Sequence, residues 1–184
     1  VTVPLQESEF RYDADTYTVS YPAVELLSGT GYAATVLSRV SGPMGADLGS
    51  HVWLFNTEVP EVMSSWPPAG QDGVSTTAAR IQLVFSRPVA HVDADDFQVL
   101  ARALGDTVSA SQLVTITAPS ARDSVGATIL SFAPEGGFLP FTRYRVTMSA
   151  EVLGELATES YSWEFSTAAR LDDAALGGVI SNGS

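Results

Sequence analysis

The sequence contains no cysteine and no lysine. Without cysteine there is no thiolate nucleophile, no cysteine-ligated zinc or iron–sulfur site, and no disulfide. Stability must then come from a hydrophobic core, and 184 residues with 45% hydrophobic content are enough to form one. All nine basic residues are arginines, against 21 acidic residues, which gives a net charge of −12. A chain with this much negative charge repels the phosphate backbone of nucleic acids. We therefore expect no nucleic-acid binding.

Long apolar runs are also missing. No stretch approaches the roughly 20 residues that a membrane helix needs, so we expect no membrane span. The chain starts at Val1 without a leader in which charged residues precede apolar ones. We therefore interpret it as a segment of a longer polypeptide from which a leader could have been removed.

Catalytic motifs are equally scarce. The sequence has only two histidines, His51 and His91, and neither belongs to a Gly-x-Ser-x-Gly or His-Glu-x-x-His pattern. The glycines of segment 29–34 superficially match a dinucleotide-binding loop, but an alternating run follows them where that motif requires a helix. We predict a turn there, structural or solvent-exposed histidines, no cofactor and no enzymatic activity.

One acidic cluster is a candidate metal site. Asp93, Asp95 and Asp96 lie within four residues of one another, and calcium prefers carboxylate oxygens on a flexible loop. The twelve-residue EF-hand pattern is absent, and three carboxylates fall short of the usual six to eight ligands. A single helical turn capped by Asp93 explains the same residues. The sequence therefore predicts a turn and leaves calcium as an alternative.

Apolar and polar residues alternate in several short runs. In segment 80–85 every second residue is apolar, and segments 144–148 and 161–165 alternate in the same way. This period is typical of antiparallel sheets with one face in water. Glycine and proline interrupt the runs, as in 66–70 and 134–137. We predict an all-β fold of antiparallel β-sandwich type with little helix.

The early part of the chain recurs about 110 residues later, a period that indicates a repeated domain and not a solenoid. In this repeat Tyr32 and Tyr144 occupy the place of a tyrosine corner, in which a tyrosine hydroxyl bonds to nearby backbone. Trp53 and Trp163 are predicted to pack between the sheets. The matching segments are 30–36 with 142–148, 53–57 with 163–167, Val1–Val3 with 114–116, and Pro22 with Pro134.

Five pieces of the sequence, in order, resemble the bacterial immunoglobulin-like domain of S-layer-associated (Big_5) type. The resemblance covers nearly all of 58–169 and, through the repeat, the last strands of a preceding module. It implies tandem immunoglobulin-like sandwiches in a protein of the bacterial cell surface. The pieces are 60–70, 81–89, 130–134, 142–147 and 161–167, the last reading Tyr-Ser-Trp-Glu-Phe-Ser-Thr.

The repeat and the resemblance together predict three parts. Residues 1–57 are the C-terminal part of a first module, residues 58–169 a complete module, and residues 170–184 a tail or the start of a linker. The first module as given lacks its opening strands. It could start in mid-domain, which we favour, be a smaller degenerate sandwich, or be completed by a strand from a neighbouring chain.

The resemblance implies a structural role, as a spacer or assembly unit of a cell-surface, S-layer-like or fibre protein. The expected partners are neighbouring immunoglobulin-like modules or identical subunits. The alternative is an adhesin or a carbohydrate-binding accessory module that contacts surface glycans. That role needs exposed aromatic residues in loops, for which Trp66 and Phe141 are the candidates.

Overall fold

A computed structural model describes residues 9–16, 18–21, 26–36, 49–77, 79–89, 91–106, 110–124 and 126–169. Within these residues the chain forms strands, 3₁₀ turns that include η2 (Ala94–Asp96) and η3 (Ala150–Leu153), and no α-helix. The predicted all-β class is therefore confirmed. The strands are β1 (Arg11–Asp13), β2 (Thr18–Ser20), β3 (Gly31–Val36), β4 (His51–Asn56), β5 (Val62–Trp66), β6 (Ile81–Phe85), β7 (Phe97–Ala103), β8 (Gln112–Leu113), β9 (Ser120–Ser124), β10 (Ala127–Phe132), β11 (Thr142–Met148) and β12 (Tyr161–Ser166).

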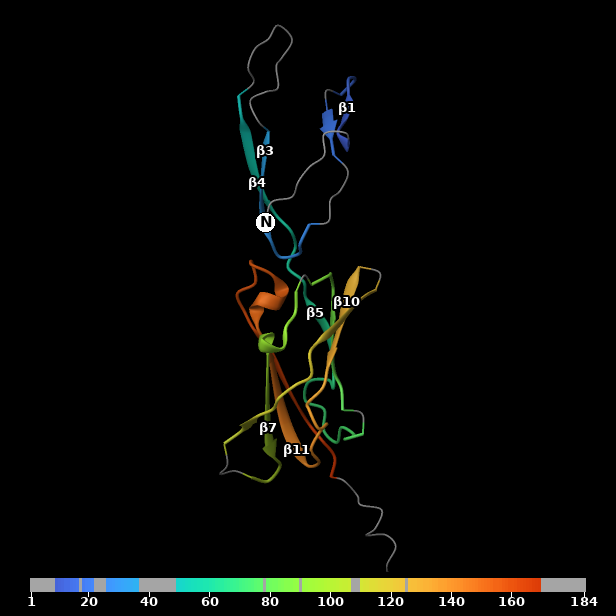
Figure 1. The fold of residues 1–184 in the computed structure, drawn as a ribbon, viewed down its shortest axis with the longest axis vertical. Helices are drawn as coiled ribbons and strands as arrows, with labels where there is room; N and C mark the ends of the chain where they lie inside the picture. The colour runs from blue at the N-terminus through green and yellow to red at the C-terminus, as the bar shows by residue number, and fades with distance from the viewer. Residues whose placement is uncertain are drawn as a thin grey trace, which may run out of the picture.

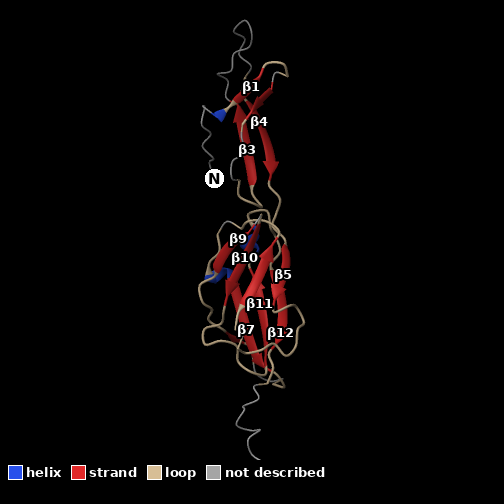
Figure 2. Ribbon diagram, turned by 90° about the vertical axis from the view of Figure 1, so that its right-hand side faces the viewer, coloured by secondary structure: helices blue, strands red, loops and turns tan. Residues whose placement is uncertain are grey.

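Strands β5 to β12 form two four-stranded antiparallel sheets, which we call the sandwich (Figure 2). One sheet has the order β5-β6-β10-β9 and the other β12-β11-β7-β8. This arrangement is that of an immunoglobulin fold, in which strands A, B, E and D pair in one sheet and strands G, F, C and C′ in the other. The predicted antiparallel β-sandwich is confirmed.

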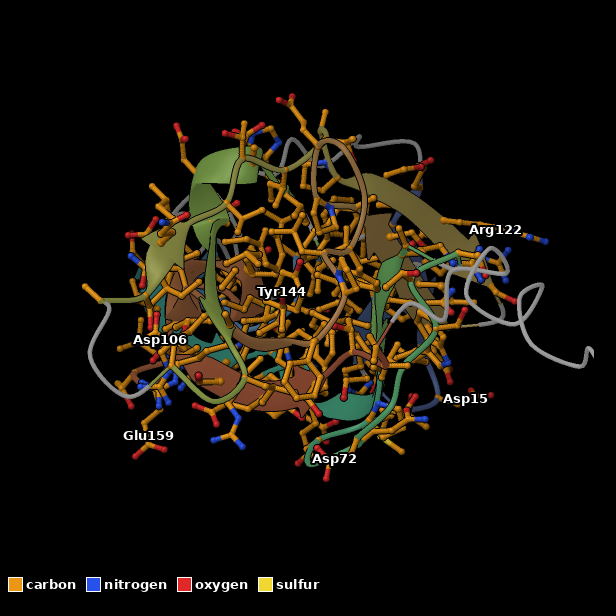
Figure 3. All side chains as sticks on the ribbon, turned by 90° about the horizontal axis from the view of Figure 1, so that it is seen from below. Asp15, Asp72, Asp106, Arg122, Tyr144 and Glu159 are labelled. Atoms are coloured by element: carbon orange, nitrogen blue, oxygen red, sulfur yellow. The ribbon has the colours of Figure 1, made fainter. Side chains whose placement is uncertain are left out.

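The alternating positions of the sequence form the core between the two sheets. On β6, Ile81, Leu83 and Phe85 are fully buried, and the residues between them are partly exposed. Tyr144 on β11 lies near the centre of the sandwich when it is viewed along the long axis of the molecule (Figure 3). Trp163 on β12 is only 4% exposed, so its predicted place between the sheets is confirmed.

The segment after β5 crosses to the second sheet. Val74 forms a parallel bridge with Thr167, where the Val74 amide donates to Ser166 O at 2.9 Å and the Ala168 amide donates to Val74 O at 2.9 Å. These bonds cover part of the free edge of β12, which would otherwise present unpaired backbone groups.

Two separate hairpins, β1–β2 and β3–β4, lie beyond one end of the sandwich along the long axis (Figure 1). The register of β3–β4 is the register of β11–β12, so the sequence repeat is also a repeat of strand pairing. The corresponding pairs are Tyr32–Phe55 and Tyr144–Phe165, Ala34–Trp53 and Val146–Trp163, and Val36–His51 and Met148–Tyr161.

Trp53 contradicts one prediction made from the repeat. Its side chain is 45% exposed, and that of Phe55 is 37% exposed, so Trp53 does not pack between two sheets as Trp163 does. The reason is that no sheet covers β3–β4 within the described residues, where β3 pairs only with β4. The matches at Val1–Val3 and Pro22, and the tail 170–184, lie outside the described residues.

Candidate functional site

A buried hydrogen-bond network holds the turn that precedes β11. The Leu139 amide donates to the Tyr144 hydroxyl at 2.7 Å, as in a tyrosine corner. The Thr167 hydroxyl donates to Leu139 O at 2.7 Å and accepts from the Thr142 amide at 3.0 Å. Burial raises the pKa of Tyr144 above its ordinary value of 10.0, because the phenolate would lose its hydration.

The same network recurs before β3. The Leu27 amide donates to the Tyr32 hydroxyl at 2.8 Å. The Thr57 hydroxyl donates to Leu27 O at 2.7 Å and accepts from the Thr30 amide at 2.9 Å. Both predicted tyrosine corners are therefore present, one in the sandwich and one in the N-terminal hairpins.

Ring stacking and backbone geometry also repeat between the two corners. Tyr32 stacks on Phe55 at 5.5 Å and 18°, and Tyr144 stacks on Phe165 at 5.4 Å and 16°. Gly29 (φ 59°) and Phe141 (φ 49°) are equivalent positions in the repeat. Gly29 lies two residues before β3 and Phe141 one residue before β11, because β11 begins one residue earlier relative to the repeat. A left-handed conformation is ordinary for glycine and costly for phenylalanine, so the turn imposes it on both.

The turn at Gly29 is also where the hairpins meet the sandwich, a contact that we call the junction. The Leu156 amide donates to Gly29 O at 2.9 Å. A Cβ atom on Gly29 would lie 2.2 Å from Leu153 O, and one on Gly154 would lie 2.8 Å from Gly29 O. Two backbones thus touch directly, at a separation that only glycine on both sides permits.

The linker across the junction is short and tied on both sides. Between β4 and β5, the Gly29 amide donates to Glu58 O at 2.9 Å, and the Glu61 amide donates to the Ser86 hydroxyl at 2.9 Å. The Glu58 side chain forms an ion pair with Arg87, which follows β6. The linker is therefore bonded to the turn above it and to the sandwich below it.

The side of β3–β4 that carries Tyr32, Ala34, Trp53 and Phe55 is the second candidate surface, which we call the open face. Its counterpart on β11–β12 is the buried, core-facing side. Trp163 and Phe165 are 4% and 2% exposed, against the 45% and 37% of the corresponding residues of the open face. An exposed aromatic face of this kind is uncommon on a monomeric protein and indicates an interaction surface.

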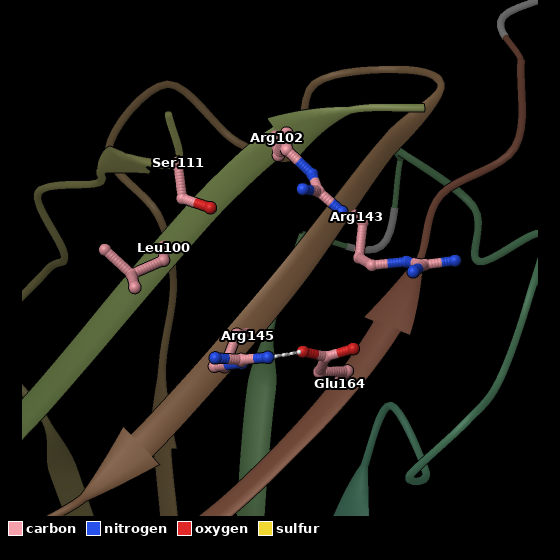
Figure 4. Close-up of a pocket in the computed structure, with 6 residues that line it drawn as sticks. All are labelled: Leu100, Arg102, Ser111, Arg143, Arg145 and Glu164. Carbon is pink, nitrogen blue, oxygen red and sulfur yellow. Dashed lines mark hydrogen bonds and ion pairs between the residues drawn. The ribbon is translucent and has the colours of Figure 1, made fainter. Parts of the chain in front are cut away.

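The third surface is a group of arginines on the solvent side of the β12-β11-β7-β8 sheet (Figure 4). Arg102 and Arg143 are directly opposite each other on β7 and β11, and they line a shallow hollow with Arg145. Arg145 Nε donates to Glu164 Oε1 at 2.6 Å. Arg102 and Arg143 have no ion-pair partner among the described residues. Like charges in directly opposed positions destabilise a sheet, and an anion would relieve that repulsion.

The acidic residues proposed as calcium ligands have other contacts. The Asp93 amide donates to Asp96 Oδ2 at 2.7 Å, which closes the predicted one-turn helix η2. Asp93 Oδ2 bonds to His91 Nε2 at 2.8 Å. Among the residues that the structure describes, no three metal-ligating side chains come together, Asp95 included. Calcium binding at this turn therefore stays an untested alternative, without a preformed set of ligands among these residues.

Three other sequence predictions can be compared with the structure. His51, predicted to be structural or solvent-exposed, is exposed on β4, with its ring centroid 6.0 Å from that of Trp53. Segment 29–34 leads into strand β3, as expected of a turn. Trp66 was expected in an exposed loop, and this is wrong: it ends β5 and is half-buried against the core, while Phe141 is 53% exposed.

Sequence reasoning missed the junction glycines and the arginine group. Gly29 and Gly154 are visible in the sequence, but nothing local shows that each faces the other's backbone. The arginines lie on different strands, so their proximity follows from the register of β7 with β11. The only local signal is the spacing of Arg143 and Arg145 on the polar face of one strand.

No helix among the described residues is long and apolar enough to cross a membrane. No curated protein matches the chain. One solved structure that resembles it is the crystal structure of selenomethionine PcoC, a copper resistance protein from Escherichia coli. The two chains are 17% identical, with a TM-score of 0.38, over 58% of this chain and 98% of that one. A likeness of this size gives no ground for assigning copper to this chain.

Comparison of the sequence with known protein families identifies the family of the chain. The family described as "Bacterial Ig-like domain" matches residues 56–167, which comprise the sandwich and the linker before it. The order of the strands in the two sheets agrees with this match. The chain therefore belongs to the bacterial Ig-like domain family.

Proposed function

We propose that the chain is a structural spacer or assembly module in a bacterial cell-surface protein, of the kind found in S-layers or fibres, without enzymatic activity. The observation that carries the proposal is the junction. Direct backbone contact between Gly29 and the loop that contains Gly154 fixes the hairpins to the end of the sandwich. A spacer must hold its units at a set distance, and a bonded contact serves this better than a free linker.

The linker supports the same proposal. A connection between freely moving domains is exposed and flexible, with few contacts across it. Here the residues between β4 and β5 bond to the turn at Gly29, to Ser86 and to Arg87. The predicted partners, which are neighbouring immunoglobulin-like modules or identical subunits in the extracellular space, fit such an end-to-end arrangement.

The proposal is tested by measuring a distance across the junction. Because the native sequence has no cysteine, Thr35→Cys and Arg122→Cys give one exposed label on the hairpins and one on the sandwich. Electron spin resonance should give one narrow distribution of distances between two nitroxides at these sites. A broad distribution in the otherwise unchanged protein would contradict a rigid spacer.

Glycine substitutions make the test specific. Gly29→Ala places a methyl group in contact with Leu153 O and should broaden the distribution. Gly73→Ala is the control, since Gly73 also has a positive φ (70°) but a Cβ there would have nothing within 4 Å. It should cost about 1 kcal/mol of backbone strain and leave the distance unchanged.

The arginine group favours a second candidate function, that of an adhesin or an accessory module that binds surface glycans. Guanidinium groups pair well with the carboxylates and sulfates of acidic sugars. In this case the protein should bind acidic glycans on an array, and replacement of Arg102 and Arg143 by glutamine should abolish binding. Arg122→Gln on β9 of the other sheet is the matched control. Absence of binding to any acidic glycan would leave the spacer as the function.

A further inference from the structure

The solvent face of the β12-β11-β7-β8 sheet is basic at one end. Arg102 near the end of β7 and Arg143 near the start of β11 are both exposed and lie directly opposite each other. Neither has an ion-pair partner among the described residues. They leave two uncompensated positive charges at this end of the sheet, on a chain whose net charge is −12.

The opposite end of the same sheet is acidic. The turn η2 leads into β7, η3 follows β11, and the loop after η3 leads into β12. The Ser149 amide donates to Asp96 O at 2.8 Å, so the two turns lie against each other, at the end of the sandwich next to the hairpins (Figure 1). Segments 91–96 and 149–160 contain no arginine and six carboxylates, which are Asp93, Asp95, Asp96, Glu151, Glu155 and Glu159.

The strip between the two ends is polar but already paired. Arg145 Nε donates to Glu164 Oε1 at 2.6 Å across β11 and β12. The hydroxyls of Thr147 and Ser162 are bonded to each other at 3.0 Å on the same two strands. A partner that covers this strip leaves no charge there without a counter-ion, which is what makes burial of charged groups tolerable.

We propose that this solvent face binds the same face of a second copy of the chain, with the strands of the two copies antiparallel. A twofold axis across the strands then lays each strand over its own counterpart in reverse. Arg102 meets Asp95 of the second copy, which precedes β7, and Arg143 meets Glu151 of the second copy, which follows β11. The proposal rests on the assembly role proposed above and names the surface that performs it.

Charge decides both the orientation and the partner. With parallel strands, the same twofold contact would place the arginines of one copy on those of the other, and like charges in contact repel. The stretch of β7 from Asp96 to Arg102 is about 20 Å long at about 3.3 Å per residue, so the two ends act as separate contacts. A long acidic glycan laid along the face would be attracted at one end and repelled at the other. A second copy matches both ends.

The size of the face sets the expected strength of the dimer. Three strands about 4.8 Å apart and about seven residues long cover roughly 25 by 15 Å, well below the about 800 Å² per partner of a stable interface. We therefore expect a weak dimer, with a dissociation constant on the order of 10–100 μM, that becomes effective when many units are held in one array.

The experiment is a charge exchange followed by sedimentation equilibrium in 0.15 M NaCl, where repulsion between the acidic copies is screened beyond about 8 Å. One variant carries Arg102→Glu and Arg143→Glu, and the other carries Asp95→Arg and Glu151→Arg. Each variant alone opposes like charges at both contacts, so its dimerisation should weaken at least about 100-fold. An equimolar mixture opposes unlike charges at both contacts and should form heterodimers with about the native dissociation constant.

The matched control replaces two arginines outside the face. Arg80, just before β6, and Arg122, on β9, are both exposed and belong to the other sheet or its approach. Arg80→Glu with Arg122→Glu changes the net charge by the same amount as the first variant. Dimerisation of this control should stay within about twofold of the native protein, because its altered charges lie far from the contact.

Three results would overturn the proposal. The first is a native chain that remains monomeric at about 1 mM, well above the expected dissociation constant. The second is a dimer that survives in both charge variants, which would assign it to another surface such as the open face. The third is a mixture of the variants that does not associate. A monomer that binds acidic glycans through Arg102 and Arg143 would assign the site to glycans. The distance across the junction is measured within one chain, so the rigid spacer and this dimer can fail separately.

Discussion

The two tyrosine corners allow one hydrogen bond to be compared in two environments. Tyr144→Phe and Tyr32→Phe each remove a hydroxyl that accepts from a backbone amide, at 2.7 Å and 2.8 Å respectively. The geometry is the same, but Tyr144 is 1% exposed inside the sandwich, and the bond of Tyr32 is exposed. Any difference between the two variants therefore measures burial and not bond length.

The expected magnitudes follow from the cost of an unsatisfied donor. In Tyr144→Phe the Leu139 amide loses its partner in a part-buried position, which costs about 1–3 kcal/mol. In Tyr32→Phe water replaces the hydroxyl at the Leu27 amide, so the change should stay within about 0.5 kcal/mol. For a unit of roughly 110 residues, 1 kcal/mol corresponds to about 4 °C in Tm, so Tyr144→Phe should lower Tm by about 4–12 °C.

Urea unfolding followed by tryptophan fluorescence measures both variants, because Trp163 is buried in the sandwich with Tyr144 and Trp53 lies on β4, in the hairpin that contains Tyr32. Amide exchange at Leu139 should accelerate in Tyr144→Phe, which identifies the bond that was lost. Equal stability losses in the two variants would refute the reasoning, since burial would then not decide the cost.

Three further predictions concern charge. Burial raises the pKa of Tyr144, so the folded state keeps the phenol proton at a pH where the unfolded state loses it. The free energy of unfolding should therefore be constant near pH 9 and fall as pH rises above 10. Calorimetry should find a smaller fall in Tyr144→Phe. Arg145→Ala breaks the exposed ion pair with Glu164 and should cost about 0.2–1 kcal/mol in low salt and less in 1 M NaCl, as measured by urea unfolding. Calcium should give no heat in titration calorimetry and no change in Tm, because the Asp96 carboxylate accepts from the Asp93 amide and the Asp93 carboxylate bonds to His91. Binding of one equivalent of calcium that Asp95→Asn abolishes would instead establish a calcium site.

The sandwich could be predicted from sequence because its signals are local and repeated. The residues of β6, β11 and β12 alternate strictly, and alternation decides which side chains face the core whatever the partner strand is. The repeat was informative for the same reason, since each copy contains a whole turn, with Tyr, Thr and the residue of positive φ at fixed positions.

What the sequence left unpredicted depends on partners that are distant in the chain. Trp53 and Trp163 lie in nearly the same local pattern, and only the covering strands decide that one is buried and the other is not. Likewise, Gly154 follows a 3₁₀ turn as an ordinary C-terminal glycine, and its second role appears only when Gly29 lies against it. The side chain of Trp66 was misjudged because a proline-rich neighbourhood indicates a loop, while the core extends to the end of β5.

Phe141 has a consequence for how an array of such units could be built. At the junction the residue equivalent to Phe141 is Gly29, and the loop that contains Gly154 approaches it so closely that even a methyl group would not fit. At the other end of the sandwich the equivalent position is occupied by the side chain of Phe141, which is about half exposed. The backbone of a following unit could not approach this turn as closely as the loop of Gly154 approaches Gly29. It would have to contact the aromatic ring instead. The turn at Gly29 and the turn at Phe141 are thus unlike as docking sites, and an array that contains both would have two kinds of contact between successive units, one through backbone and one through an aromatic ring.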